Sequence, residues 1–178
     1  GYLNLKEPFA GLLTQGMVCH ETYKDPEGKW LLPEEIEKTD EGHLITLKTK
    51  QPVTLGRPEK MSKSKKNVVD PAKIISEYGA DTARLFMLSD SPPNRDLDWT
   101  DSGVDGAWRY INRLWRMISE PNIPICPIEK KEPEEMAPKI EAAWRRIHKT
   151  VYATSKDLDK FHFNKAIARI RELTNTLD

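Results

Sequence analysis

A run of four lysines within residues 60–66 constrains this chain more than any other feature of its sequence. The run reads Lys-Met-Ser-Lys-Ser-Lys-Lys. Ammonium groups this close together repel one another unless an anion lies among them, and the interleaved serines can donate hydrogen bonds to such an anion. Asp70 and Pro71 follow as a helix cap and a first helical residue. A basic loop that leads into a helix N-terminus is an arrangement that binds polyphosphate.

The simpler interpretation of this run is a solvated surface loop, a localisation signal or a nonspecific nucleic-acid patch. The string at residues 60–64 favours a specific function, because Lys-Met-Ser-Lys-Ser is identical to the signature loop of class I aminoacyl-tRNA synthetases. Lys65 favours the leucyl group of that family, whereas Lys66 stands where the family commonly has glycine. Further segments also resemble the bacterial-type leucyl group, at residues 12–18, 78–87, 98–107 and 113–116. The resemblance covers the C-terminal part of the catalytic domain and the start of the anticodon-binding domain.

The resemblance implies an enzyme that joins leucine and ATP as leucyl-adenylate and then transfers leucine to tRNA(Leu). Negative charge shifts onto the departing pyrophosphate, so the reaction needs cations that bind the transition state better than they bind ATP. Lys60 and Lys63 are the implied catalytic residues, and Met61, Ser62 and Ser64 complete the implied ATP-binding set. The implied ligand is ATP with Mg²⁺, and we expect no residue of this chain to ligate a metal.

The second signature of class I synthetases, His-Ile-Gly-His, has no counterpart in this sequence, and the four histidines are scattered. We therefore expect a segment of a larger enzyme that is inactive alone, with most of the leucine pocket outside it. Two alternatives stay open. One is a non-catalytic tRNA-binding module, and the other is a related isoleucyl, valyl or methionyl synthetase.

Composition limits the class of protein further. Hydrophobic residues make up 38% of the chain and charged residues 31%, which suits several thin modules better than one thick core. The formal net charge is +0, so an RNA partner requires local basic faces. The longest apolar run is too short to cross a membrane. Cys19 and Cys126 lack metal-ligand spacing and are interpreted as reduced thiols. Together with the resemblance, this predicts a monomeric cytoplasmic protein.

Four segments are expected along the chain, in an α+β arrangement of several modules. Residues 1–20 would end a Rossmann-like catalytic domain, with a buried strand at residues 12–18. Residues 21–57 contain two turn signals, at residues 25–28 and 40–42, and short apolar runs, and would form a small β-rich insert. Residues 58–102 would hold the signature loop and a helical connective region. Residues 103–178 would begin a mainly α-helical anticodon-binding bundle.

Helix signals follow the lysine run. One helix is expected at residues 71–78, with Gly79 as its stop. A second helix is expected after Asp81, and its core residues would be Leu85, Phe86 and Leu88. A third is expected to begin with a capping box formed by Ser102 and Asp105.

The third helix has two opposite faces. Its apolar face would be buried and consists of Ala107, Ile111, Leu114, Trp115 and Ile118. Its other face carries Arg109, Arg113 and Arg116, which are either solvated or contact tRNA phosphates. Arg145, Arg146 and Lys149 form a weaker candidate of the same kind.

Residues 120–137 are rich in Pro and Glu and are expected to be a linker. A long helix is expected after Pro138, with an apolar stripe formed by Ile140, Trp144, Ile147, Val151, Thr154 and Leu158. A further helix that starts near Phe163 has the same rhythm, so the two would pack as an antiparallel pair. Trp115 and Trp144 are expected in the core rather than as stacking platforms for nucleobases.

Overall fold

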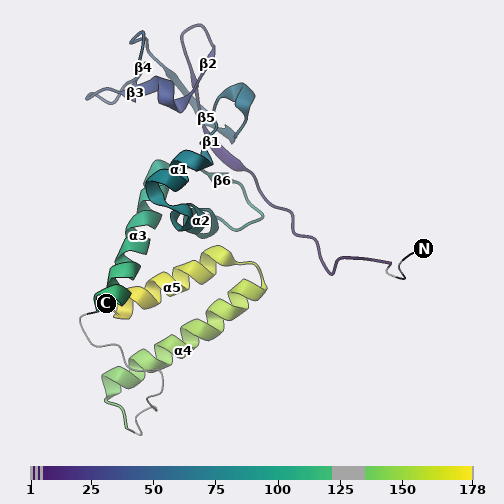
Figure 1. Cartoon of the computed structure of the whole chain (residues 1–178), viewed down its shortest axis with the longest axis vertical. Coiled ribbons are helices and arrows are strands. Elements are labelled where there is room, and N and C mark those ends of the chain that lie inside the picture. Colours follow the sequence, from purple (N-terminus) through teal and green to yellow (C-terminus); the bar gives the residue numbers. More distant parts are fainter. Residues whose placement is uncertain (1, 3, 5, 122–134, 178) are drawn as a thin grey trace.

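The computed structural model describes residues 2, 4, 6–121 and 135–177, and shows a mixed α/β chain. Its strands gather at one end of the long axis, and the pair formed by α4 (Pro138–Asp159) and α5 (Phe163–Leu177) lies at the other end (Figure 1). The mixture of strands and helices predicted from the sequence is confirmed, whereas the end of a Rossmann-like domain followed by a helical bundle stays a prediction. The division into domains stays a prediction. Most of the expected linker lies outside the described residues, as does Cys126.

Strand β1 (Val18–Lys24) is the centre of the main sheet. It pairs antiparallel with β5 (Thr54–Lys60) along one edge. On the other edge it pairs parallel with β6 (Leu97–Asp98) near its beginning and antiparallel with β2 (Trp30–Leu31) near its end. Because β5 runs directly into residue 61, this sheet fixes the start of the lysine run.

The segment between β2 and β5 forms a smaller sheet. After the short 3-10 helix η1 (Pro33–Glu35), strand β3 (Ile36–Lys38) pairs antiparallel with β4 (Leu44–Thr46). Both predicted turns close as the sequence indicates. The Gly28 N–H donates to the Asp25 carbonyl over 3.0 Å, and the Gly42 N–H donates to the Thr39 carbonyl over 2.8 Å. The short strands predicted within residues 21–57 are therefore confirmed.

The buried strand predicted at residues 12–18 is wrong. The chain before β1 runs out from the body as an extended segment, and Leu12 is 90% exposed (Figure 1). A buried strand needs neighbouring strands to pair its backbone groups, and no strand in the described part of the chain lies beside residues 6–16. Backbone anchoring begins at Gly16, whose N–H donates to the Pro93 carbonyl over 2.9 Å.

The helix predicted at residues 71–78 is confirmed as α1 (Pro71–Tyr78). The Asp70 carboxylate accepts a hydrogen bond from the Ala72 N–H over 2.9 Å, and Gly79 ends the helix at a φ of 85°. This positive φ is one that glycine adopts without a steric cost. Helix α2 (Ala80–Ser89) follows at once, so Asp81 lies in its first turn and not ahead of it.

Helix α3 (Asp101–Ser119) starts two residues earlier than the predicted capping box requires. The cap is Thr100, whose Oγ1 accepts from the Gly103 N–H over 3.2 Å, and Ser102 lies inside the helix. Asp105 instead accepts a hydrogen bond from the Tyr78 hydroxyl, which raises the pKa of Tyr78. The capping-box prediction is therefore wrong, because Thr100, two residues before Ser102, caps the helix first.

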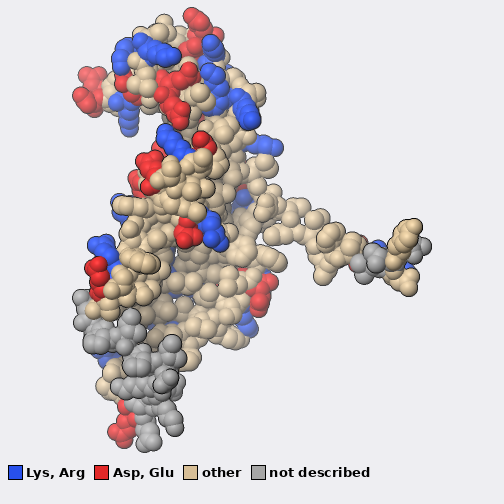
Figure 2. All heavy atoms as spheres, viewed as in Figure 1, with Lys and Arg blue, Asp and Glu red and all other residues tan. Residues whose placement is uncertain are grey.

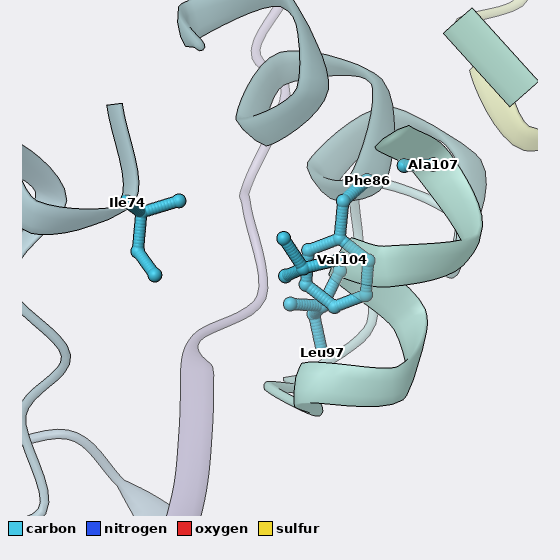
Figure 3. Close-up of a cluster of buried hydrophobic side chains, with 5 residues drawn as sticks. All are labelled: Ile74, Phe86, Leu97, Val104 and Ala107. Carbon is cyan, nitrogen blue, oxygen red and sulfur yellow. The ribbon is translucent and has the colours of Figure 1, made fainter. Parts of the chain in front are cut away.

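The core lies where α1, α2 and α3 meet the sheet. Figure 3 shows its buried side chains, which are Ile74, Phe86, Leu97, Val104 and Ala107. The Phe86 ring meets the Trp99 ring edge to face, with centroids 5.1 Å apart. Leu85 packs against this cluster, as predicted, but Leu88 is exposed, contrary to prediction. Leu88 lies two residues after Phe86, and positions two apart on a helix do not share a face.

Helices α4 and α5 form the predicted antiparallel pair, joined by a tight turn. The buried Asp157 carboxylate accepts from Arg169 Nε over 2.6 Å, and the Asp157 carbonyl accepts from the His162 N–H over 2.8 Å. The turn passes through Phe161 at a φ of 58°. Asp157 thus fixes both the turn and the contact between the helices.

Several residues of the predicted stripes are exposed. Trp115 is 71% exposed and Trp144 is 37% exposed, so the prediction that both are core residues is wrong within the described structure. The other predicted stripe residues with exposed side chains are Ile118, Ile140, Val151 and Leu158. Helix α4 packs chiefly against α5, and only part of its predicted stripe, including Ile147 and Thr154, is half-buried.

Candidate nucleotide-binding site

The signature loop, residues 60–66, lies between the end of β5 and the start of α1. Lys60 is paired with Cys19 in the sheet, and the Met61 N–H donates to the Val18 carbonyl over 3.0 Å. The loop then forms a single 3-10 turn, η2 (Lys63–Lys65). Lys66 ends this turn in the left-handed region, at φ 54° and ψ 21°. The sheet therefore anchors the first half of the loop, and its second half turns sharply toward α1.

The two serines of the loop order it from within. Ser62 caps η2, because its Oγ accepts a hydrogen bond from the Lys65 N–H over 3.3 Å. The Ser64 Oγ lies 3.2 Å from the Ser62 Oγ, within hydrogen-bond distance. These contacts bring together the two hydroxyl groups of the predicted ATP-binding set.

The four lysines divide into two pairs. Lys65 is paired with the Glu59 carboxylate, and Lys66 Nζ lies 3.3 Å from Glu35 Oε2 of η1. Lys60 and Lys63 are exposed, and no ion pair of either is found among the described residues. Half of the positive charge is therefore neutralised inside the protein, while the two predicted catalytic lysines remain available to an external anion.

The carboxylates beside the loop are held in their charged form. The Lys65 hydrogen bond lowers the pKa of Glu59, and nearby Arg57 acts in the same direction. The pKa of Glu35 is also lowered, chiefly by the hydrogen bond from the Leu32 N–H and further by Lys66. Over the neutral pH range both carboxylates stay ionised and keep their lysine partners.

Asn67 is a residue of this site that sequence reasoning missed. Its side chain is 0% exposed and hydrogen-bonds to the loop and to both strands below it. An asparagine after a lysine run is indistinguishable by residue type from an ordinary loop residue. The only signal was its place between the signature string and the Asp70 cap.

The Met61 side chain lines a cavity of about 250 Å³. The cavity lies between the loop, α1 and α2, and it is lined also by Val18, Ile74, Met87 and Trp99. The lining is almost wholly apolar. Met61 therefore faces a cavity lined by apolar residues of α1 and α2.

The donor set of the loop suits an anion and not a metal ion. It offers ammonium and hydroxyl groups, and its two nearest carboxylates are engaged by lysines. Mg²⁺ instead prefers carboxylate, phosphate and water oxygens. No group of three or more His, Cys, Asp or Glu side chains suited to a metal ion occurs in the described part of the chain.

The predicted arginine face of α3 is only partly an open surface. Arg113 Nη1 donates to the Asn175 Oδ1 over 2.7 Å, so this arginine joins α3 to α5. Arg109 and Arg116 are exposed. In the weaker candidate on α4, Arg145 pairs with Glu141 over 2.6 Å, while Arg146 and Lys149 are exposed. Figure 2 shows basic and acidic side chains intermixed over the strand-bearing end of the molecule.

The profile of the family described as tRNA synthetases class I (I, L, M and V) matches residues 50–100. This stretch contains β5, the signature loop, α1 and α2, so the similarity to this family covers the region around the site. The chain is also 63% identical over 177 residues to the leucine–tRNA ligase of Paramagnetospirillum magneticum and 56% identical to that of Rhodospirillum rubrum. The chain is thus homologous to a segment of leucine–tRNA ligases, which confirms the resemblance predicted from the sequence.

These alignments cover 99% of the chain but only 20% of either ligase, so the chain spans about one-fifth of the length of these relatives. A solved structure is also similar to this chain over nearly its whole length. The LeuRS of Agrobacterium radiobacter K84, in a ternary complex with tRNA and LeuAMS, matches with a TM-score of 0.64 and 28% identity, over 99% of this chain and 18% of that one. Among the described residues, no helix is both long and apolar enough to cross a membrane.

Proposed function

We propose that this chain is the part of a leucine–tRNA ligase that carries the phosphate-binding loop for leucine activation. The observation that carries the proposal is the division of the lysines. Lys60 and Lys63 are exposed without a carboxylate partner in the described structure, on a loop whose other two lysines are paired. The homologous ligases support leucine as the amino acid.

In the proposed reaction, a carboxylate oxygen of leucine attacks the α-phosphorus of ATP. The bond from that phosphorus to the bridging oxygen breaks, and pyrophosphate leaves with the electron pair. Lys60 and Lys63 bind the negative charge that accumulates on the leaving group, which stabilises the transition state more than bound ATP. Ser62 and Ser64 hold the loop and donate to phosphate oxygens, and Met61 packs beneath it. Mg²⁺ bound to ATP would neutralise part of the phosphate charge, and no residue of this chain is proposed to ligate it.

The remaining parts of the chain have proposed places in the same enzyme. Residues 1–20 end the Rossmann-like catalytic domain and residues 21–57 form an insert. Residues 58–102 connect the signature loop to the helices, and residues 103–178 begin the anticodon-binding bundle. Leucine is then transferred to tRNA(Leu), and the enzyme works as a cytoplasmic monomer. Exposed Arg109 and Arg116 support a tRNA contact on α3.

A second candidate is a tRNA-binding module without catalysis. The same exposed arginines favour it, but it leaves the unpaired lysines of the signature loop without a task. Transfer RNA binding with no leucine-dependent reaction in the full-length protein would favour this candidate over the ligase.

The test is Lys63→Ala in the full-length protein that contains this chain, assayed by leucine-dependent exchange of pyrophosphate into ATP. We expect kcat to fall by about 10²–10³, with a smaller change in KM for ATP, because the lost cation acts mainly on charge in the transition state. Lys160→Ala, at an exposed lysine beyond α4, is the matched control and should exchange as wild type does. Unchanged exchange in Lys63→Ala would refute the catalytic role, and an equal loss in ATP affinity would make Lys63 a ground-state binding residue.

A further inference from the structure

Asn67 is the fully buried polar residue directly behind the signature loop. Its Oδ1 accepts from the Ser62 N–H over 2.9 Å. Its Nδ2 donates to the Glu59 carbonyl over 2.9 Å and to the His20 carbonyl over 3.1 Å, with the Lys60 carbonyl at 3.5 Å. One amide thus joins the loop to both central strands and uses both of its donors and an acceptor.

These contacts fall where the β1–β5 ladder is irregular. His20 and Glu59 are the last regular pair before the register shifts, which it does between His20 and Thr22. Pro58 lies in that interval and has no N–H to offer the ladder. The Asn67 amide supplies donors to two carbonyls at the place where the strands themselves pair poorly.

The hydrogen bond from the Ser62 N–H to Asn67 bears on the position of Lys63. Ser62 is the N-cap of η2, and Lys63 is the first residue of that turn. Among the described contacts of the loop, the Asn67 acceptor is the one that fixes the Ser62 backbone to the sheet. The neighbouring ties act at other points: the Met61 N–H bonds to Val18, and the ion pairs hold Lys65 and Lys66.

We propose that Asn67 is a positioning residue of the signature loop, which holds the Ser62 cap so that Lys63 projects from the loop in its reactive direction. This inference rests on the proposed ligase function and assigns to that site a residue outside the Lys-Met-Ser-Lys-Ser string. Asn67 touches neither substrate nor the reacting atoms. It acts through the orientation of Ser62 and Lys63, and a displacement of about 1 Å in such a group can lower a rate by as much as about 10²-fold.

The experiment uses two variants in the full-length protein. Asn67→Ala removes all of the contacts, and Asn67→Asp keeps the shape and the acceptor but removes both donors and sets a negative charge against two carbonyl oxygens. Asn112→Ala is the matched control, because the Asn112 amide also donates to a backbone carbonyl, that of Trp108, but on α3. Leucine-dependent pyrophosphate exchange and hydrogen–deuterium exchange of residues 60–67 are measured for each protein.

We expect kcat to fall by about 10- to 100-fold in both Asn67 variants, with KM for ATP changed by less than about threefold. Amide exchange within residues 60–67 should accelerate by about tenfold or more, while β1 and α1 stay protected. Asn112→Ala should match wild type in both measurements. A kcat loss that merely tracks the fraction of folded protein, measured by active-site titration, would overturn the proposal, as would loss of protection throughout β1 and α1.

The two readouts also separate this proposal from the proposed function. If the wild-type protein shows no leucine-dependent exchange, the ligase function fails, yet hydrogen exchange still decides whether Asn67 holds the loop. If the wild-type protein is active and residues 60–67 exchange equally in wild type and both variants, the Asn67 proposal fails and the ligase function stands.

Discussion

Two glycines of α3 that lie three residues apart should respond to the same substitution in opposite directions. A Cβ on Gly103 would lie 2.5 Å from Phe86 Cε2 and 2.8 Å from Thr100 Oγ1. A Cβ on Gly106 would meet no heavy atom within 4 Å. Both residues are helical, so alanine improves helix propensity at either position. The difference between Gly103→Ala and Gly106→Ala therefore isolates packing against the core.

The expected magnitudes follow from what each methyl group meets. Gly106→Ala should stabilise the fold by about 0.4–1 kcal/mol, because it restricts the unfolded chain without a new clash. At Gly103 the same gain is opposed by overpacking, which costs about 1–3 kcal/mol. The Phe86 ring cannot retreat easily, because it is buried and lies edge to face against Trp99. Displacing the Thr100 cap costs about 1 kcal/mol more, so Gly103→Ala should destabilise by about 1–3 kcal/mol.

Urea unfolding of both variants, followed by far-ultraviolet circular dichroism, measures the difference. We expect the unfolding midpoint of Gly106→Ala to rise and that of Gly103→Ala to fall, at similar slopes. A Gly103→Ala protein as stable as wild type would show that the Phe86 ring gives way. A destabilised Gly106→Ala protein would contradict the propensity argument itself.

Three further predictions concern charged groups. Replacing Arg109 and Arg116 with Gln should leave the free energy of unfolding within about 0.5 kcal/mol of wild type. The double variant should bind tRNA more weakly, and the slope of log affinity against log salt should become shallower by up to about one unit per lost contact. Salt titrations that superimpose on wild type would mean that both arginines belong to a solvated face. The pKa of Asp157 is lowered by the Arg169 hydrogen bond, so the stability it contributes is present above its unfolded pKa near 4 and lost as pH falls through the lower folded value. Asp157→Asn should therefore unfold with a midpoint that falls less than that of wild type between about pH 6 and pH 3, and parallel curves would contradict this. Lys66→Gly should change stability by less than about 1 kcal/mol, because glycine relieves the left-handed backbone strain and this offsets the lost ion pair with Glu35. Lys66→Val keeps the strain and should destabilise by about 1–2 kcal/mol. Equal thermal midpoints for the two variants would refute the argument from backbone strain.

Features encoded by neighbouring residues could be predicted from the sequence. The helix at residues 71–78 was predicted in full, because the Asp70 cap, the Pro71 start and the Gly79 stop are local signals. The turns closed by Gly28 and Gly42 belong to the same class. Each depends on backbone geometry within a few residues, so no tertiary information is needed.

Burial on an apolar stripe could not be predicted in the same way. The periodicity of α4 was correct, yet Val151 and Leu158 are exposed, whereas Ile147 is half-buried. A stripe of period 3.6 says which residues share a face, but the extent of burial depends on how wide an element covers it. The strand prediction at residues 12–18 failed for the same reason, since apolar residues cannot supply their own sheet.

The candidate site, too, could be predicted only where neighbouring residues encode it. The lysine string predicts a phosphate-binding loop, but the partners of this loop come from far along the chain. Glu35 is 31 residues before Lys66, and His20 is 47 residues before Asn67. No spacing rule links such positions. Only the paired strands β1 and β5 and the turn η1 bring them beside the loop.

The ion pairs of Lys65 with Glu59 and of Lys66 with Glu35 lower the repulsion within the loop, which the residues of the loop alone do not indicate. Two unit charges about 4 Å apart cost about 1 kcal/mol in water and about 4 kcal/mol near a protein surface, so four ammonium groups on one short loop oppose a compact conformation. Glu59 and Glu35 remove half of that charge and hold the loop to β5 and η1. An anion bound between Lys60 and Lys63, as proposed above, would lower the repulsion that remains between them. An anion with several negative oxygens would lower that repulsion more than an anion with a single charge.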